Sequence, residues 1–275
     1  MLKQLKNIPW RLLGSITLVL IGVVGVVMLM GLVRKKDASQ TCTALQIFVE
    51  GKETFIDQAD ITAIIQNQFG QVIGRQLQDI PLHKIEKALT ALPYVSQAGI
   101  YVDIDGAMRV TVQQRAILLR VINRVGQEFY VDTEGKKIPT TLKYVPHTIV
   151  ANGNIRESFG KPLQPVESQV VDDLATIVRH INQSELWSNQ VVQLYVNDNG
   201  DIELVPRVGD QDLILGNAEN LDDKLRRFEI FYQKILPRVG TEAYSKVNVK
   251  YADQIICERY GDWFIDSLQM KMNKL

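Results

Sequence analysis

The sequence predicts an α+β protein whose folded part follows a single transmembrane helix. Residues 12–33 form an apolar run of about 22 residues without a charge, close to the roughly 20 that an α-helix needs to cross a bilayer core. Residues 45–116 combine alternating apolar positions with two helical patterns. Residues 117–257 combine further short strands, which predict a mixed sheet, with two amphipathic helices that cover it.

The apolar run is typical of an uncleaved signal anchor. It is longer than a signal-peptide core, and Arg34, Lys35 and Lys36 follow it where a cleavage site would need small residues. A lipoprotein signal would need small residues before its cysteine, whereas Cys42 follows Ser-Gln-Thr. The alternative interpretation is a buried core helix.

The orientation of the chain follows from the short N-terminal segment. Three basic residues precede the apolar run and three follow it, so the charge bias is nearly balanced. A segment of residues 1–11 is easier to retain in the cytoplasm than the long remainder, and long domains translocate largely regardless of their charge. We therefore expect residues 1–11 in the cytoplasm and residues 34–275 outside it.

The composition excludes several classes of protein. The 31 basic and 31 acidic side chains cancel, so nothing indicates a nucleic-acid partner. Two cysteines do not make a disulfide framework, and whether Cys42 and Cys257 pair is left open.

The first module begins after a polar linker, residues 34–44. Residues 45–49 have strand character, and Asp57 is a good N-cap for a helix that ends near Gly70. A second helix is predicted to start at residues 79–81 and to end before Pro93.

A hairpin is predicted to close this module. Its apolar positions alternate on both sides of Gly106, which predicts one buried face: Ile100, Val102, Ile104, Met108, Val110 and Val112. The predicted order is β-α-α-β-β over residues 45–116.

The sequence motifs of this module resemble those of a known family. Ile47-x-Val49-x-Gly51 opens it, Ile85-Glu86-Lys87-Ala88-Leu89 leads to Leu92-Pro93-Tyr94-Val95, and Gly106-x-x-x-Val110-x-Val112 closes it. A membrane anchor followed by this pattern resembles the POTRA domain of the FtsQ/DivIB bacterial cell-division proteins. The family usually ends the module with Glu-Arg-x-Pro, whereas Gln114-Arg115-Ala116-Ile117 lacks the Glu and the Pro.

The second module, residues 117–257, is predicted as a β-domain with covering helices. Strands are expected at residues 118–125, 128–131, 191–196, 202–205 and 212–216, and helices at residues 166–183 and 221–235, the second ended by Pro237. A last strand is predicted over Lys246–Cys257, followed by a tail, residues 258–275. The family carries Asp-Leu-Arg-Tyr in this strand, where the chain has Asn248-Val249-Lys250-Tyr251.

Candidate catalytic and metal sites have simpler interpretations. Residues 197–201 could be a calcium loop, but flanking strands favour a hairpin turn. None of His83, His147 and His180 has a metal-ligand spacing with another His or Cys. Asp103 and Asp105 could form an acid–base pair, but they are better explained as a solvated strand face beside a turn.

The resemblance implies a non-enzymatic scaffold of the division machinery at the septum, in the inner membrane, with periplasmic domains. It implies partners of the FtsB and FtsL type, which are short coiled-coil membrane proteins, and no cofactor, nucleic acid or small-molecule substrate. The partner site is expected on the last strand, at Lys250, Tyr251, Val249, Val247 and Ile255. The alternatives are a membrane-anchored envelope enzyme or a POTRA-type translocation accessory.

Overall fold

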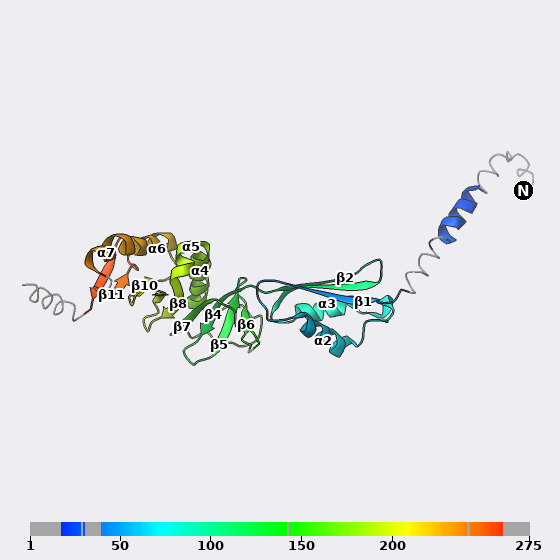
Figure 1. The fold of residues 1–275 in the computed structure, drawn as a ribbon, viewed down its shortest axis with the longest axis horizontal. Helices are drawn as coiled ribbons and strands as arrows, with labels where there is room; N and C mark the ends of the chain where they lie inside the picture. The colour runs from blue at the N-terminus through cyan, green and yellow to red at the C-terminus, as the bar shows by residue number, and fades with distance from the viewer. Residues whose placement is uncertain (1–17, 29, 31–39, 142, 241–242, 261–275) are drawn as a thin grey trace, which may run out of the picture. The chain divides into compact units, whose positions relative to one another are not determined.

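The computed structural model describes residues 18–28, 30, 40–141, 143–240 and 243–260 (Figure 1). The described chain forms two compact units. The first unit consists of the described residues within Met1–Glu50, Ile56–Ala91 and Gln97–Gln113, and the second of those within Gly51–Phe55, Leu92–Ser96 and Gln114–Leu275. The division predicted from the sequence, at residues 45–116 and 117–257, stays a prediction.

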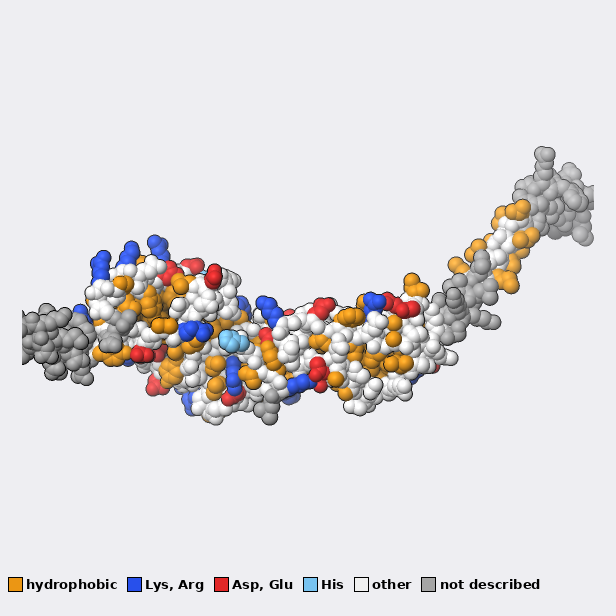
Figure 2. Space-filling view, in the orientation of Figure 1, with side chains coloured by type: hydrophobic (Ala, Val, Ile, Leu, Met, Phe, Trp, Pro, Cys, Tyr) orange, Lys and Arg blue, Asp and Glu red, His pale blue; other side chains and the backbone are white. Residues whose placement is uncertain are grey.

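The predicted membrane segment is described only in part. Residues 18–28 are helical, and their apolar side chains are largely exposed (Figure 2). Among the described residues, no helix has both the length and the apolar character needed to cross a bilayer. The rest of the predicted span, residues 12–17, 29 and 31–33, lies outside the described residues, as do residues 1–11, 34–39 and 261–275.

The first unit has the predicted β-α-α-β-β order. Its sheet has the strand order β1-β3-β2, with β1 (Ala44–Glu50) parallel to β3 (Ala107–Gln114), while β2 (Val95–Val102) forms a hairpin with β3. The helices are α2 (Gln58–Phe69), the short 3-10 turn η1 (Leu77–Asp79) and α3 (Leu82–Thr90). Met108, Val110 and Val112 are fully buried, which confirms the predicted inner face of β3.

Local sequence signals set the ends of these elements. Asp57 caps α2: its side chain accepts a hydrogen bond from Asp60 N at 2.8 Å, and Asp57 N donates one to the Asp60 carboxylate at 3.0 Å. Gly106 turns the hairpin with a φ of 84°, and a Cβ there would lie 2.7 Å from the Thr41 carbonyl oxygen. Ile104 was predicted to be buried, which is wrong: it is 98% exposed because it lies in the turn that follows β2.

The second unit is built on a nine-stranded mixed sheet. Its strand order is β12-β11-β10-β9-β8-β7-β4-β5-β6, with parallel pairs β4/β7, β7/β8 and β10/β11. The strands are β4 (Ile117–Ile122), β5 (Glu128–Asp132), β6 (Lys137–Pro139), β7 (Ile149–Gly153), β8 (Val191–Val196), β9 (Ile202–Pro206), β10 (Asp212–Gly216), β11 (Tyr244–Asn248) and β12 (Ile256–Arg259). This arrangement confirms the predicted mixed sheet.

Helices α4 (Gln169–Gln183), α5 (Glu185–Gln190), α6 (Leu221–Ile230), the π-helical turn η2 (Phe231–Ile235) and α7 (Leu236–Val239) accompany this sheet (Figure 1). Leu174, Val178 and Phe228 are fully buried in the core that helices and strands share. The prediction that Pro237 ends the last helix is wrong, because the chain stays helical to Val239. Proline has no N–H to donate to the preceding turn, and the π-helical turn η2 ends at Ile235, just before Pro237. The change from α- to π-helical hydrogen bonding at η2 lets the helix continue through Pro237.

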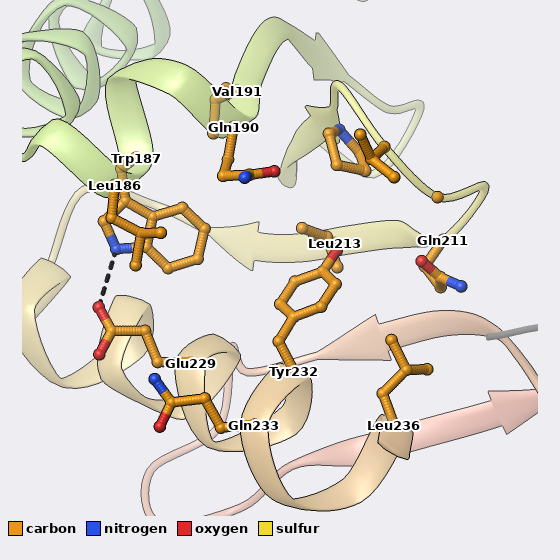
Figure 3. A pocket seen from close by; sticks show the side chains of 13 residues that line it. Leu186, Trp187, Gln190, Val191, Gln211, Leu213, Glu229, Tyr232, Gln233 and Leu236 are labelled. Carbon is orange, nitrogen blue, oxygen red and sulfur yellow. Dashed lines mark hydrogen bonds between the residues drawn. The ribbon is translucent and has the colours of Figure 1, made fainter. Parts of the chain in front are cut away.

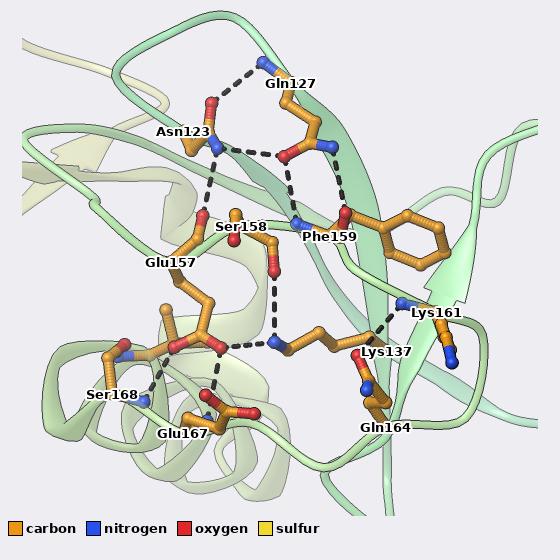
Figure 4. Close-up of polar contacts among 11 residues, drawn as sticks. Asn123, Gln127, Lys137, Glu157, Ser158, Phe159, Lys161, Gln164, Glu167 and Ser168 are labelled. Atoms are coloured by element: carbon orange, nitrogen blue, oxygen red, sulfur yellow. Dashed lines mark hydrogen bonds and ion pairs between the residues drawn. The ribbon is translucent and has the colours of Figure 1, made fainter.

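A buried polar network ties the segment before α4 to β6 (Figure 4). Lys137 Nζ lies 2.5 Å from Glu157 Oε1 and donates a hydrogen bond to the Ser158 carbonyl at 3.0 Å. The Glu157 carboxylate also accepts hydrogen bonds from Ser168 N at 2.7 Å and Glu167 N at 3.2 Å. Both charged side chains are at most 4% exposed, so this network holds two charges inside the unit.

Candidate partner-binding site

The segment expected to bind a partner is not one continuous strand. The predicted strand over Lys246–Cys257 is wrong: β11 ends at Asn248, residues 249–255 form a loop, and β12 starts at Ile256. The pairing of β11 with its neighbour β10 ends at Asn248 and Ile214, although β10 itself continues to Gly216. After Val249 the chain leaves the sheet, turns and returns as β12.

The loop separates the five predicted residues into buried and exposed groups. Val247 and Val249 are fully buried in the core, and Val249 N donates a hydrogen bond to the Ile214 carbonyl at 3.0 Å. Ile255 is half-buried against the same core. Lys250 and Tyr251 face outward, and Tyr251 is 52% exposed. The five residues therefore do not lie on one strand, as the sequence prediction had placed them.

Arg227 holds the loop through its backbone. The guanidinium of this α6 residue donates to the carbonyl oxygens of Tyr251 and of Gln254, the latter at 3.0 Å, and pairs with Asp223 at 2.8 Å. Because these hydrogen bonds of Arg227 go to the main chain of the loop, they fix the position of Tyr251 and leave its ring exposed. Lys224 and Arg227 are charged residues of this amphipathic helix, yet they are only 4% and 7% exposed.

Lys250 leans toward the turn between β8 and β9. Its Nζ lies 2.6 Å from Asp201 Oδ1, and this hydrogen-bonded pair raises the pKa of Lys250. Its stem passes close to Gly216, where a Cβ would come within 3.0 Å of Lys250 Cγ. The side chain remains 40% exposed, so the amine is partly neutralised but reachable.

A polar cavity of about 420 Å³ lies beside the loop. Asp201, Asn217, Asp223, Lys224 and Tyr251 are among the residues that line it. Burial lowers the pKa of Lys224, whose Nζ donates to the Asn217 carbonyl at 3.0 Å and side chain at 2.7 Å. The cavity can receive a polar side chain next to the exposed Tyr251 ring.

The strand that follows the loop lies at the end of the sheet. β12 pairs with β11 on one side, and it is the last strand in the sheet order. Ile256 is 41% exposed, and Glu258 and Arg259 are exposed. An end strand of this kind can accept another strand by main-chain hydrogen bonds. The loop 249–255 and β12 are therefore adjacent in the chain and both accessible.

Other candidate residues have structural roles. Asp103 pairs with Arg109 at 2.7 Å, and the Asp105 side chain accepts a hydrogen bond from Ala107 N at 3.0 Å, so both belong to the hairpin turn. Asn197 closes a hairpin between β8 and β9, as the turn interpretation predicted, by accepting from the backbone of Asn199 and Asp201.

The described residues also bear on metal binding and on disulfide formation. Over the residues that the structure describes, no group of three or more His, Cys, Asp or Glu is placed to hold a metal ion. Cys42 and Cys257 are both free, and burial raises the pKa of the Cys257 thiol.

The comparisons with known proteins agree with this architecture. Residues 40–113 match the model of the POTRA-like domain, so the chain is a protein with a POTRA-like module followed by a mixed α+β unit. Residues 118–258, just over half of the chain, match the model described as FtsQ/DivIB, C-terminal related. The chain belongs to the FtsQ/DivIB family, and the two matches indicate a cell-division protein. No curated protein sequence matches the chain significantly.

Proposed function

We propose that this protein is a non-enzymatic scaffold of the bacterial divisome that binds other division proteins through loop 249–255 and strand β12. The observation that carries the proposal is the exposed Tyr251 ring on a loop held by Arg227, directly before an end strand. Tyrosine offers a large apolar area with one polar tip and is a frequent interface anchor. Family membership supports division partners for this surface.

The proposed partners are short coiled-coil membrane proteins of the FtsB and FtsL type. An incoming strand would extend the sheet beyond β12, while Tyr251 and Lys250 would supply side-chain specificity. An acidic side chain suits Lys250, which is partly exposed next to Asp201. Val247 and Val249 support the loop from the core, and Ile255 contributes its half-buried side chain.

We also propose that residues 12–33 span the inner membrane once, with residues 1–11 in the cytoplasm and the two units in the periplasm, at the division septum. The apolar, charge-free run supports this, and its described part, residues 18–28, is helical. Protease added to spheroplasts should digest the two units. Their protection in spheroplasts with an intact inner membrane would contradict the orientation.

A binding titration tests the partner site. Tyr251→Ala in the full chain should weaken binding of an FtsB-type partner by about 2 kcal/mol or more with little change in melting temperature, and Lys250→Glu should weaken it further. Tyr101→Ala is the matched control, because Tyr101 is 50% exposed but belongs to the first unit. Unchanged binding by a folded Tyr251→Ala, Lys250→Glu protein would contradict the proposed site.

A further inference from the structure

An apolar groove lies on the helical side of the second unit, away from the loop at Tyr251. It has a volume of about 380 Å³ and lies between α5 and the η2–α7 segment (Figure 3). Its lining is mainly apolar and includes Leu186, Trp187, Val208, Leu213, Tyr232 and Leu236. Val208 is 71% and Leu186 is 46% exposed, so apolar side chains at the groove face solvent. Figure 2 shows hydrophobic side chains gathered on the face that carries α6 and α7.

One polar group in the groove has no partner among the described residues. The Tyr232 hydroxyl is buried and makes no hydrogen bond there, and burial raises the pKa of this phenol. Figure 3 shows the Tyr232 ring pointing from η2 toward Leu213 on β10. By contrast, the Trp187 indole donates to Glu229 Oε1 at 3.2 Å. The groove therefore offers an apolar surface with one unused hydroxyl.

The described chain ends beside this groove. The β10–β11 pairing sets Asp212 opposite Lys246, and the β11–β12 pairing sets Tyr244 opposite Arg259. The end of β12 therefore reaches the same end of the sheet at which β10 begins. The Tyr260 hydroxyl lies 3.4 Å from the carbonyl oxygen of Asp210, between the lining residues Gly209 and Gln211.

The chain beyond Tyr260 has a composition that suits an apolar groove. Residues 261–275 contain seven large apolar side chains: Trp263, Phe264, Ile265, Leu268, Met270, Met272 and Leu275. Phe264, Leu268, Met272 and Leu275 follow helical spacing, with acidic residues at 262 and 266 and basic residues at 271 and 274. A helix of this length would extend about 22 Å, enough to cross the groove from its rim.

We propose that the groove between α5 and η2–α7 is the docking site of the chain's own C-terminal segment, residues 261–275. The segment starts at the groove's rim, so its tether gives it a high effective concentration there. Its apolar stripe would cover Val208 and Leu186, and its polar groups could bond the Tyr232 hydroxyl. Docking would fix the C-terminal end of β12, a strand of only four residues. This site goes beyond the proposed partner site.

Hydrogen exchange of the full chain in nanodiscs tests the docking. Val208→Asp places a charge on an exposed groove residue and should speed exchange of the amides at 263–272 by about tenfold or more. Val125→Asp is the matched control, because Val125 is 77% exposed in the turn between β4 and β5, and it should leave the tail unchanged. Ending the chain after Tyr260 should speed exchange in the loop at 206–211.

Three results would overturn the proposal. One is tail exchange that is equally fast in the wild type and in Val208→Asp. The second is tail protection that rises with protein concentration, which would indicate a second copy of the chain. The third is tail protection that requires anionic lipid and is unchanged by Val208→Asp, which would indicate that the tail binds a membrane surface. None of these variants alters Tyr251, so the partner titration reports separately on the proposed function.

Discussion

Removing one member of the buried pair between Lys137 and Glu157 should strongly destabilise the second unit. In Lys137→Met the cation is lost, together with its contacts to Glu157 at 2.5 Å and to the Ser158 carbonyl at 3.0 Å. The Glu157 carboxylate, 4% exposed, would remain with hydrogen bonds from the backbone of Ser168 and Glu167. Breaking a buried pair in this way typically costs about 3–5 kcal/mol, because an uncompensated charge stays behind.

Thermal unfolding measured by near-ultraviolet circular dichroism provides the assay. A loss of that size should lower the melting temperature by about 10 °C in a unit of this size. Lys136→Met is the control: the neighbouring Lys136 pairs with Glu134 at 2.7 Å on the surface, where such pairs contribute about 1 kcal/mol or less. Adding Glu157→Gln to Lys137→Met should recover part of the loss. Equal effects of Lys136→Met and Lys137→Met would refute this reasoning.

The same pair predicts a pH dependence. Burial alone raises the pKa of Glu157, but hydrogen bonds from Lys137, Ser168 and Glu167 outweigh it, and the net pKa is lowered. The native state therefore binds fewer protons than the unfolded state at mildly acidic pH. The resulting stabilisation is present above the unfolded pKa of about 4.3 and is lost as the pH falls through the lower folded value. The deficit of Lys137→Met should accordingly shrink as the pH is lowered and Glu157 becomes protonated.

Three further changes test local features. Gly106→Ala should destabilise the first unit by about 2 kcal/mol in chemical denaturation, because φ is 84° and the added Cβ would meet the Thr41 carbonyl at 2.7 Å. Asp57→Ala should cost about 1 kcal/mol in the same assay through the lost cap of α2, whereas Asp57→Asn should retain most of it. Arg227→Met should speed hydrogen exchange in the loop at Tyr251, because two carbonyls lose their donor, and unchanged exchange would contradict the role assigned to Arg227.

The sequence allows much of the first unit to be predicted because its signals are local. The alternation of Met108, Val110 and Val112 needs only the two-residue period of a strand. The cap at Asp57 depends on a side chain three residues away. Ile104 continues the same alternation but lies in a turn. Its burial was predicted wrongly because the alternation alone does not show where a hairpin reverses.

The second unit is less predictable, because its details depend on contacts far apart in the sequence. The end of β11 coincides with the end of its pairing with β10, and no pattern within residues 246–257 encodes that contact. Arg227 has the polarity of a surface residue, yet its long side chain reaches the carbonyl of Gln254, 27 residues away in the sequence. Helix α5 has only six residues, which is too short to produce a clear helical period, and it was not predicted.

Photocrosslinking in dividing cells is the most direct test of the partner site. Benzoylphenylalanine placed at Tyr251, which is 52% exposed, should form an adduct with a division protein, and the adduct should be lost when Lys250→Glu is added. The same probe at Tyr101, which is 50% exposed on the first unit, should not capture that protein. Adducts with the same division protein at Tyr101 and none at Tyr251, in cells that divide normally, would contradict the assignment of the site to loop 249–255 and β12.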